Sequence, residues 1–347
     1  MGDVMSKSLS VITTDRGKSR RNEPLDLAAY LQSRIIGQED ALWEMIPYLE
    51  MYQANLNPIG RPAGVFLLLG PTGTGKTRTA EVVAEALHGS DRHLLRIDCG
   101  EYQMDHEVAK LVGAPPGYLG HKETQAVLSQ QRLEAVTSEY SRLSVVLFDE
   151  IEKAAPSMQR ILLGILDKAF LRTGDNNPVN FENSVIFLSS NLGAKEMADQ
   201  ARPALGFHTG SPDTSAGKLH ATAMHAVKKR FAPEFMNRID VTVTYRPLRR
   251  QAMEAILEQQ LAALQNLIDV RLGMQTFLLR FTKECKDYLL ESGFSEEFGA
   301  RELKRAVQRG VLQPLASLVI QKRLPPGRRV EVGFDPDEGN TTFKLLR

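Results

Sequence analysis

The stretch VFLLLGPTGTGKT, residues 65–77, decides the fold. It begins with an apolar run of strand length, continues into a match to G-x-x-x-x-G-K-T, and is followed by a helical pattern over residues 78–88. Glycines let the backbone N–H groups of such a loop turn inward around phosphate oxygens, and the following helix adds the positive end of its dipole. The stretch therefore predicts a nucleoside triphosphate site, with a Gly-rich turn that binds nothing as the alternative.

The residues of this loop receive different roles. Lys76 is expected to reach the β- and γ-phosphates of ATP, and the Thr77 hydroxyl is expected to bind Mg²⁺. The other residues expected to contact the nucleotide are Pro71, Thr72, Gly73, Thr74 and Gly75.

A second apolar run, Ser144–Phe148, ends in the adjacent carboxylates Asp149 and Glu150. Ligands of α/β sheets bind beyond the carboxyl ends of the strands, so these acids can face the phosphates. Asp149 is expected to hold Mg²⁺ directly or through water, and Glu150 to orient and deprotonate the water that attacks the γ-phosphorus. A strand that simply ends in solvated acids is the alternative, and the upstream GPTGTGKT favours the catalytic interpretation.

Three further polar residues fit a hydrolytic site. Asn191 follows the apolar run 185–190, where its amide could position the attacking water or could only form a turn. Arg238 and Arg301 could stabilise the charge on a transferring phosphoryl group, or could be ordinary surface arginines. Spacing alone does not choose between these alternatives.

Composition restricts the class of protein. The formal net charge is +1 and 24% of the residues are charged, which gives no global basic field, so no nucleic-acid partner is expected. The two cysteines, Cys99 and Cys285, are far apart and lack metal-ligand spacing, which is typical of reduced thiols in a cytoplasmic protein. No apolar run approaches the roughly 18 residues that span a bilayer, so no membrane partner is expected.

The order of patterns predicts two domains after a flexible N-terminal arm, residues 1–24. Strands alternate with helices over residues 25–247, which predicts an α/β domain with a parallel sheet and helices on both faces. Residues 248–347 are expected to form a smaller, mostly helical domain that closes with a hairpin. The expected strands of the first domain are 65–69, 94–99, 144–148, 184–190 and 241–245, and the expected helices of the second are 249–271, 282–292 and 300–321.

Seven stretches in a fixed order carry a family resemblance: IIGQEDA, GPTGTGKT, GAPPGYLGH, VVLFDEIEKA, SSNLGA, FAPEFMNRID and FGARELKR. From about residue 25 to the C-terminus the chain resembles the Clp-type AAA+ protein unfoldases, most closely the second ATPase module of the two-ring disaggregases. The resemblance implies an ATP-dependent unfoldase that works as a ring, in this family usually a homo-hexamer. Within 347 residues there is no room for the first ATPase module of those disaggregases, which argues against independent disaggregation.

The resemblance also assigns residues. Ile35, Ile36 and Gly37 would pack around adenine. Asn191 would sense the γ-phosphate, and Arg301 would be a second sensor on the helical lid. Arg238 would reach the nucleotide of the neighbouring subunit.

Tyr118 and Leu119 lie in GAPPGYLG, residues 113–120, where glycines and prolines exclude a helix or a central strand. The resemblance places them in the central channel, where Tyr118 would grip an unfolded or aggregated protein substrate without reading its sequence. The alternative is a tyrosine that lies against its own subunit.

Leu205, Gly206 and Phe207 form an apolar tripeptide in a region where Clp unfoldases that dock onto a barrel peptidase carry a similar one. The alternative is that Leu205 and Phe207 fold back onto the body of the protein. Three other functions stay open at this point: the regulatory ATPase of a two-component protease, a nucleic-acid motor or loader, and a nucleotide-gated scaffold that assembles without translocating polypeptide.

Overall fold

The structure is a computed structural model that describes residues 26–113, 126–201, 212–295 and 298–346. A parallel sheet of five strands, in the order β2-β3-β6-β1-β7, forms the centre of its larger part. These strands are β1 (Gly64–Leu69), β2 (Leu94–Asp98), β3 (Ser144–Asp149), β6 (Ser184–Ser190) and β7 (Val241–Thr244).

The three central strands are buried on both faces. Every residue of β1, β3 and β6 is buried, which explains their uninterrupted apolar sequence. Alternate side chains enter two separate cores: Val65 and Leu67 belong to one, and Phe66 and Leu68 to the other. The sheet is therefore the middle layer of three.

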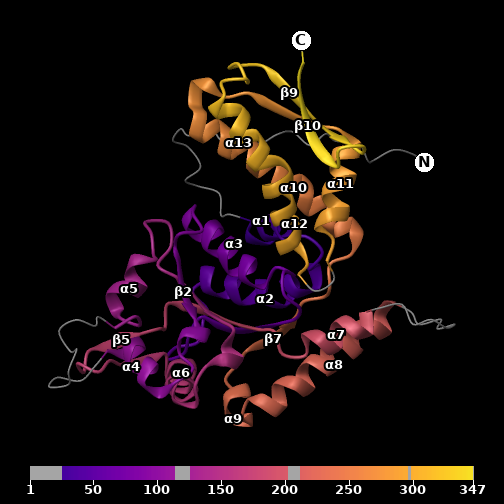
Figure 1. Ribbon diagram of the computed structural model, residues 1–347. Coiled ribbons are helices and arrows are strands. Elements are labelled where there is room, and N and C mark those ends of the chain that lie inside the picture. The colour runs from indigo at the N-terminus through magenta and orange to yellow at the C-terminus, as the bar shows by residue number, and fades with distance from the viewer. Residues whose placement is uncertain (1–25, 114–125, 202–211, 296–297, 347) are drawn as a thin grey trace, which may run out of the picture.

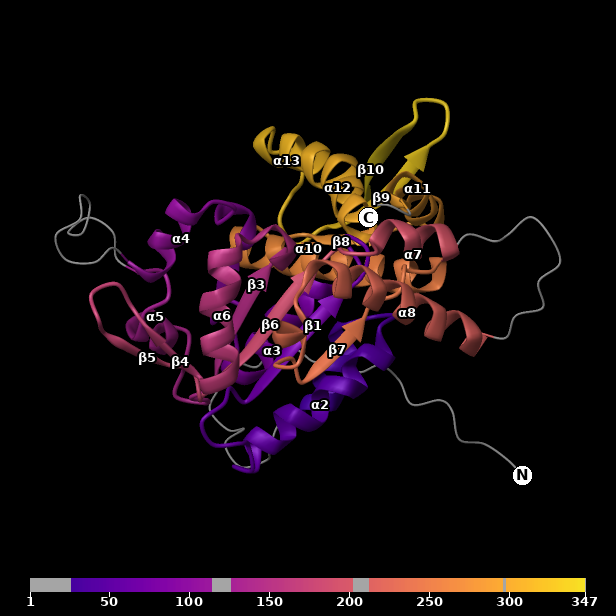
Figure 2. The ribbon, with the colours of Figure 1, turned by 90° about the horizontal axis from the view of Figure 1, so that it is seen from below.

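Helices cover both faces of this sheet. One core is closed by α1 (Leu27–Arg34), α2 (Glu39–Gln53) and α3 (Lys76–His88). The other is closed by α4 (Asp105–Val112), α5 (Gln130–Ala135), α6 (Pro156–Lys168), α7 (Ala194–Ala201), α8 (Pro212–Arg230) and α9 (Pro233–Met236). Figure 2 shows α2 and α6 on opposite sides of the strands, as predicted for an α/β fold.

The second part of the chain lies beside α1 and α3 (Figure 1). It has its own core, built from four helices and a three-stranded sheet in the order β10-β9-β8. Its elements are α10 (Arg250–Leu272), β8 (Leu278–Phe281), α11 (Lys283–Gly293), α12 (Ala300–Val307), α13 (Gln313–Ile320), β9 (Arg329–Asp335) and β10 (Asn340–Leu346). The predicted hairpin is β9–β10, whereas β8, which pairs in parallel with β9, was not predicted.

The expected single helix over 300–321 is interrupted by a π-helical turn, Gln308–Leu312. The physical reason is Pro314, which lacks an N–H and so cannot bond to the carbonyl of Gly310, four residues earlier. The hydroxyl of Thr341 on β10 donates to that carbonyl instead. Short elements elsewhere were also not predicted: the hairpin of β4 (Phe170–Arg172) and β5 (Pro178–Asn180), and the 3₁₀ turns η1 (Cys99–Glu101), η2 (Ile151–Lys153) and η3 (Gly273–Gln275).

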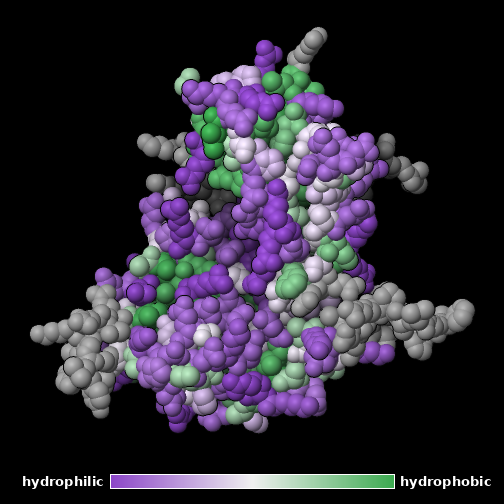
Figure 3. Space-filling model, viewed as in Figure 1, coloured by the Kyte–Doolittle hydropathy of each residue, from purple (hydrophilic) through white to green (hydrophobic). Residues whose placement is uncertain are grey.

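The surface seen in Figure 3 is largely hydrophilic, and hydrophobic residues gather on it in separate patches. Exposed apolar side chains include Val270 and Met274 near the end of α10, and Ile59 in the larger part. In the described ranges, no helix is both long enough and apolar enough to cross a membrane.

Candidate nucleotide site

The loop after β1 owes its shape to glycine. Gly70, Gly73 and Gly75 all have positive φ, at 144°, 74° and 111°. A Cβ atom on Gly70 would lie 2.5 Å from the carbonyl oxygen of Tyr245, so a side chain is excluded there by space as well as by conformation. The loop leads directly into α3, which begins at Lys76, so the N-terminal end of that helix faces the loop.

Lys76 is buried at the centre of this site. Its Nζ donates to the carbonyl oxygens of Gly70 and Pro71, at 2.6 and 2.8 Å, and to Oδ1 of Asn191 at 2.9 Å. Burial lowers the pKa of Lys76 to about 8, and the carboxylates of Glu152 and Asp149 oppose that shift. The side chain therefore remains largely a cation at neutral pH, held by oxygen acceptors that phosphate oxygens can replace.

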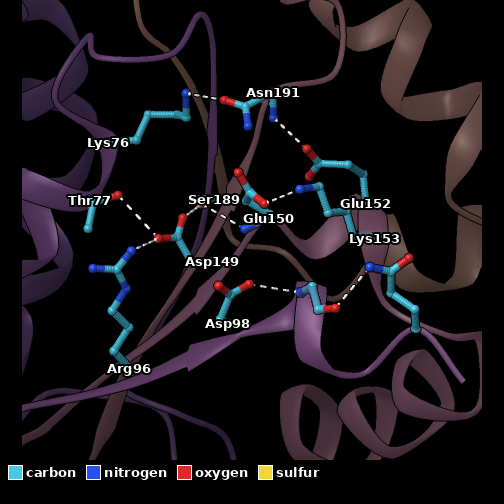
Figure 4. A network of polar contacts seen from close by, with 12 residues as sticks. Lys76, Thr77, Arg96, Asp98, Asp149, Glu150, Glu152, Lys153, Ser189 and Asn191 are labelled. Carbon is cyan, nitrogen blue, oxygen red and sulfur yellow. Dashed lines mark hydrogen bonds and ion pairs between the residues drawn. The ribbon is translucent and has the colours of Figure 1, made fainter. Parts of the chain in front are cut away.

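Asp149 ends β3 and is almost completely buried. Three groups hold its carboxylate (Figure 4): the Ser189 hydroxyl donates to Oδ1, Thr77 Oγ1 lies 3.4 Å from Oδ2, and Arg96 Nη2 lies 2.6 Å from Oδ2. A hydroxyl beside a carboxylate is a donor set that suits Mg²⁺, which binds through one or two protein groups and keeps several waters. No cluster of three or more His, Cys, Asp or Glu that could hold a metal occurs within the described residues.

Glu150 follows in the left-handed conformation, with φ 57° and ψ 49°. This conformation is uncommon for a residue other than glycine and turns the side chain out of the strand direction. Its N–H donates to Ser189 Oγ at 3.1 Å, so one serine fixes both acidic residues. The Glu150 carboxylate forms an ion pair with Lys153 at 2.5 Å.

Asn191 follows β6, the strand between β3 and β1. Its side chain accepts from Lys76, and its backbone N–H donates to Glu152 Oε1 at 3.1 Å. The exits of three adjacent strands thus bring together Lys76, Asn191 and the two acids, as the sheet rule predicts.

The segment 35–38 joins the loop to the second part of the chain. Ile35 is buried in the core below α1 and α2, and Ile36 is half-buried. Gly37 has φ 75°, and a Cβ there would lie 2.9 Å from the Cβ of Ala252 on α10. The buried Gln38 then donates to the carbonyl oxygens of Thr74, at 3.2 Å, and Arg246, at 2.9 Å. This arrangement links the phosphate loop to the chain just before α10.

A second joint connects the loop with α12. The N–H of Ala300 donates to the carbonyl of Gly73 at 3.1 Å, and a Cβ on Gly73 would lie only 2.0 Å from the carbonyl oxygen of Phe298. Arg301, in the first turn of α12, is exposed, and its positive charge contributes to the lowered pKa of Lys76. Among the described residues its guanidinium forms no ion pair.

Arg238 lies elsewhere. It precedes β7, so it sits at the amino edge of the parallel sheet, opposite the edge that carries Lys76. Its guanidinium contacts Asp167 at 3.5 Å and Glu234 at 3.4 Å. The structure therefore does not bring Arg238 to the phosphate loop of its own chain, and the predicted role in a neighbouring subunit stays a prediction.

Tyr118, Leu119, Leu205, Gly206 and Phe207 lie outside the described residues.

Four contributors to the site were not predicted: Gln38, Arg96, Glu152 and Ser189. Gln38 and Ser189 stand in IIGQEDA and SSNLGA, so their position within those stretches was the available signal. Arg96 interrupts the apolar pattern of β2, which marks it as exposed but does not identify Asp149 as its partner. Glu152 likewise stands in VVLFDEIEKA, but only the turn after Glu150 directs it toward Asn191.

The sequence matches two families. Residues 61–242, slightly more than half of the chain, match the family described as AAA domain (Cdc48 subfamily). Residues 248–332 match the C-terminal, D2-small domain, of ClpB protein.

Relatives align along nearly the whole chain. The ATP-dependent Clp protease ATP-binding subunit ClpC of Staphylococcus saprophyticus is 34% identical over 338 residues, which are 97% of this chain and 40% of that protein. The chaperone protein ClpB of Meiothermus ruber is 36% identical over 333 residues, which are 96% of this chain and 37% of that protein. The chain thus spans no more than about 40% of the length of these relatives.

Solved structures of Hsp104 share the fold. The Saccharomyces cerevisiae Hsp104:casein complex in its extended conformation gives a TM-score of 0.78 at 27% identity, covering 95% of this chain and 53% of that one. A closed-state reconstruction of Hsp104 with ATPγS and FITC casein gives 0.75 at 28% identity, covering 92% of this chain and 51% of that one. The matched domains, the relatives and the geometry of the phosphate loop agree, and the chain belongs to the Clp-type AAA+ family.

Proposed function

We propose that this protein hydrolyses ATP at the exits of β1, β3 and β6 and uses the energy to remodel other proteins. The observation that carries the proposal is the pair Asp149 and Glu150 beside Lys76, Thr77 and Asn191. Nucleotide binding alone needs the phosphate loop and one acid. Hydrolysis also needs a base that deprotonates the attacking water, and the second carboxylate, Glu150, can be that base.

In the proposed reaction, a water oxygen attacks the γ-phosphorus, the bond from that phosphorus to the β–γ bridging oxygen breaks, and Glu150 accepts a proton from the water. Lys76 neutralises charge on the β- and γ-phosphates, and the Asn191 amide orients the γ-phosphate and the water. Thr77 and Asp149 would hold Mg²⁺, which offsets the charge of the phosphates when bound.

The remaining nucleotide contacts belong to the same proposal. Pro71, Thr72, Gly73, Thr74 and Gly75 would surround the phosphates, and Ile35, Ile36 and Gly37 would lie near adenine. Arg301 would contact the γ-phosphate from α12. Residues 25–247 would then act as the nucleotide-binding domain and residues 248–347 as its lid, with residues 1–24 as a flexible arm.

A ring of identical subunits, a homo-hexamer in the family, would complete the site. Support comes from Arg238, which lies at the sheet edge remote from its own phosphate loop and would contact the nucleotide of a neighbouring subunit. Further support comes from exposed apolar side chains on the C-terminal domain, Val270 and Met274, at 75% and 99% exposure. A cytoplasmic location fits Cys99 and Cys285, which are free and buried.

The proposed substrate is an unfolded or aggregated polypeptide that Tyr118 and Leu119 grip in the channel of the ring. The names of the solved relatives support this proposal, because both Hsp104 structures contain casein. No nucleic-acid or membrane partner is proposed.

Replacing Glu150 by Gln tests the enzymatic part. We expect ATP binding to persist and the turnover number to fall about 100- to 10,000-fold, the usual contribution of a positioned base. Normal hydrolysis by Glu150→Gln would remove the assignment. Tyr118→Ala tests the mechanical part, since it should leave basal hydrolysis intact and stop the unfolding of a tagged substrate.

A second function is the regulatory ATPase of a two-component protease. The observation that favours it is the relative named as an ATP-binding subunit of Clp protease. Docking would use Leu205, Gly206 and Phe207. Co-sedimentation of a barrel peptidase with the wild type, compared with Phe207→Ala, separates this function from an independent unfoldase. A nucleic-acid motor would instead show hydrolysis stimulated by DNA or RNA and not by unfolded protein.

A further inference from the structure

Glu150, the proposed base, already has a partner. Lys153 Nζ lies 2.5 Å from Glu150 Oε2. Figure 4 shows this ion pair separate from the contacts of the Asp149 carboxylate. In the part of the chain that the structure describes, no hydrogen bond joins the Glu150 carboxylate to Lys76, Thr77 or Asn191. One of the two oxygens of the proposed base is therefore paired with an ammonium group.

Local geometry makes this pairing a built-in feature. Residues 151–153 form η2, a single 3₁₀ turn, and the N–H of Lys153 donates to the carbonyl of Glu150 at 2.9 Å. This hydrogen bond closes the turn between residues 150 and 153, so the backbone holds Glu150 and Lys153 close together and their side chains pair across the turn.

The backbone of this turn is anchored. Ile151 is completely buried, and the Arg230 guanidinium donates to the carbonyl oxygen of Glu152 at 2.7 and 3.0 Å and to that of Ala154 at 3.2 Å. The Lys153 side chain, in contrast, is half exposed. The pair can therefore separate by rotation of the lysine side chain while the turn stays in place.

Two other carboxylates can receive the lysine. Oε2 of Glu152 is buried and has no hydrogen-bond partner, although Oε1 accepts from the Asn191 N–H. The exposed Asp98 at the end of β2 accepts from Gly100 N through Oδ1. Glu152 and Asp98, after Glu150 itself, contribute to the raised pKa of Lys153, so both lie within electrostatic reach of it. A buried carboxylate oxygen without a hydrogen-bond donor costs free energy, so a new donor stabilises it more than it stabilises an oxygen exposed to water.

We propose that Lys153 is a positioning residue that holds Glu150 in a resting orientation, and that hydrolysis requires Lys153 to move to Glu152 or Asp98. The inference rests on the proposed ATPase function and adds to it a restraint within the same chain. Arrival of the lysine at Glu152 would also act on Asn191, because the other oxygen of Glu152 holds the backbone of that residue.

The test compares Lys153→Met, Lys153→Arg and a matched control in steady-state hydrolysis. Methionine keeps the length of the side chain and removes the ammonium group. We expect kcat to rise about two- to fivefold, the range that corresponds to an exposed ion pair, with KM for ATP unchanged because Lys153 lies outside the phosphate loop. Lys153→Arg retains the cation and should return kcat to the wild-type value. Lys286→Met removes a lysine from a 2.6 Å ion pair with Glu258 in the C-terminal domain, and should leave both constants unchanged.

A wild type that hydrolyses ATP and a Glu150→Gln variant that does not would establish the proposed function independently of Lys153. In that situation, an unchanged or lower kcat for Lys153→Met would overturn the inference. A structural readout is independent of activity. With a slowly hydrolysed ATP analogue bound, Lys153 Nζ should lie within hydrogen-bond distance of Glu152 or Asp98, and a retained Glu150 pair in that state would also overturn it.

Discussion

The two sides of the nucleotide site are built differently. On the sheet side, side chains contact one another directly, Lys76 with Asn191 and Asp149 with Ser189, and the Glu152 carboxylate accepts from the backbone N–H of Asn191. On the side of the C-terminal domain, the connections are mostly backbone contacts at glycines and the amide of Gln38. The sheet side thus fixes the groups that react through side-chain contacts, whereas the position of α12 depends on close backbone contacts that only glycine allows.

The largest effect is expected on the sheet side. Lys76→Ala removes the cation that three acceptors hold at the phosphate position. Hydrogen bonds to charged groups contribute about 1.5–3 kcal/mol each, so ATP should bind roughly 100-fold more weakly. Calorimetric titration with an ATP analogue measures this. A loss below about threefold would show that the sheet side does not dominate binding.

Arg301→Ala tests how much α12, on the side of the C-terminal domain, contributes to ATP affinity, measured by the same calorimetric titration. The exposed guanidinium should contribute one charge-assisted contact, so we expect affinity to fall about tenfold. Arg305→Ala, a neighbouring arginine on α12 that is paired with Glu302, is the matched control and should bind ATP normally. Equal affinities for Arg301→Ala and wild type would remove α12 from the nucleotide site.

The pH dependence of binding sharpens the contribution of Lys76. Its pKa in the nucleotide-free protein is lowered to about 8, so the cation is largely present at pH 7.5 and is lost as the pH rises to 9. Because the phosphates prefer the protonated form, ATP affinity should decline about eightfold over this interval if the neutral amine does not bind. Fluorescence titration of a labelled ATP analogue measures the decline. An affinity that rises with pH would contradict the assigned charge state.

The smallest effect is expected at the glycine joint. Gly299 has φ 50°, and a Cβ on it would lie 2.9 Å from the carbonyl oxygen of Gly73. Gly299→Ala should weaken ATP binding about threefold by displacing α12. Gly327→Ala is the control, because Gly327 also has positive φ, 72°, but a Cβ there would meet nothing within 4 Å. If Gly299→Ala and Gly327→Ala bind ATP with equal affinity, the contact between Gly299 and Gly73 does not influence ATP binding.

The sequence was most informative where one local rule was sufficient. The apolar runs of β1, β3 and β6 predicted buried parallel strands, and the rule for strand exits then predicted that Lys76, Asp149 and Asn191 would meet. The sequence was least informative where an element is short or a partner is distant. The three-residue strands β4 and β5 carry too little periodicity to be recognised. Arg96 reaches Asp149 only because β2 and β3 are neighbours, which depends on the strand order and not on either segment alone.

Imaging the protein by electron microscopy with a slowly hydrolysed ATP analogue and an unfolded polypeptide tests the proposed function most directly. The proposal predicts a closed ring with polypeptide density in its channel beside Tyr118, and with Arg238 of each subunit directed at the nucleotide of its neighbour. A monomer under every nucleotide condition would contradict it, as would a ring whose channel stays empty while Tyr118 packs against its own subunit.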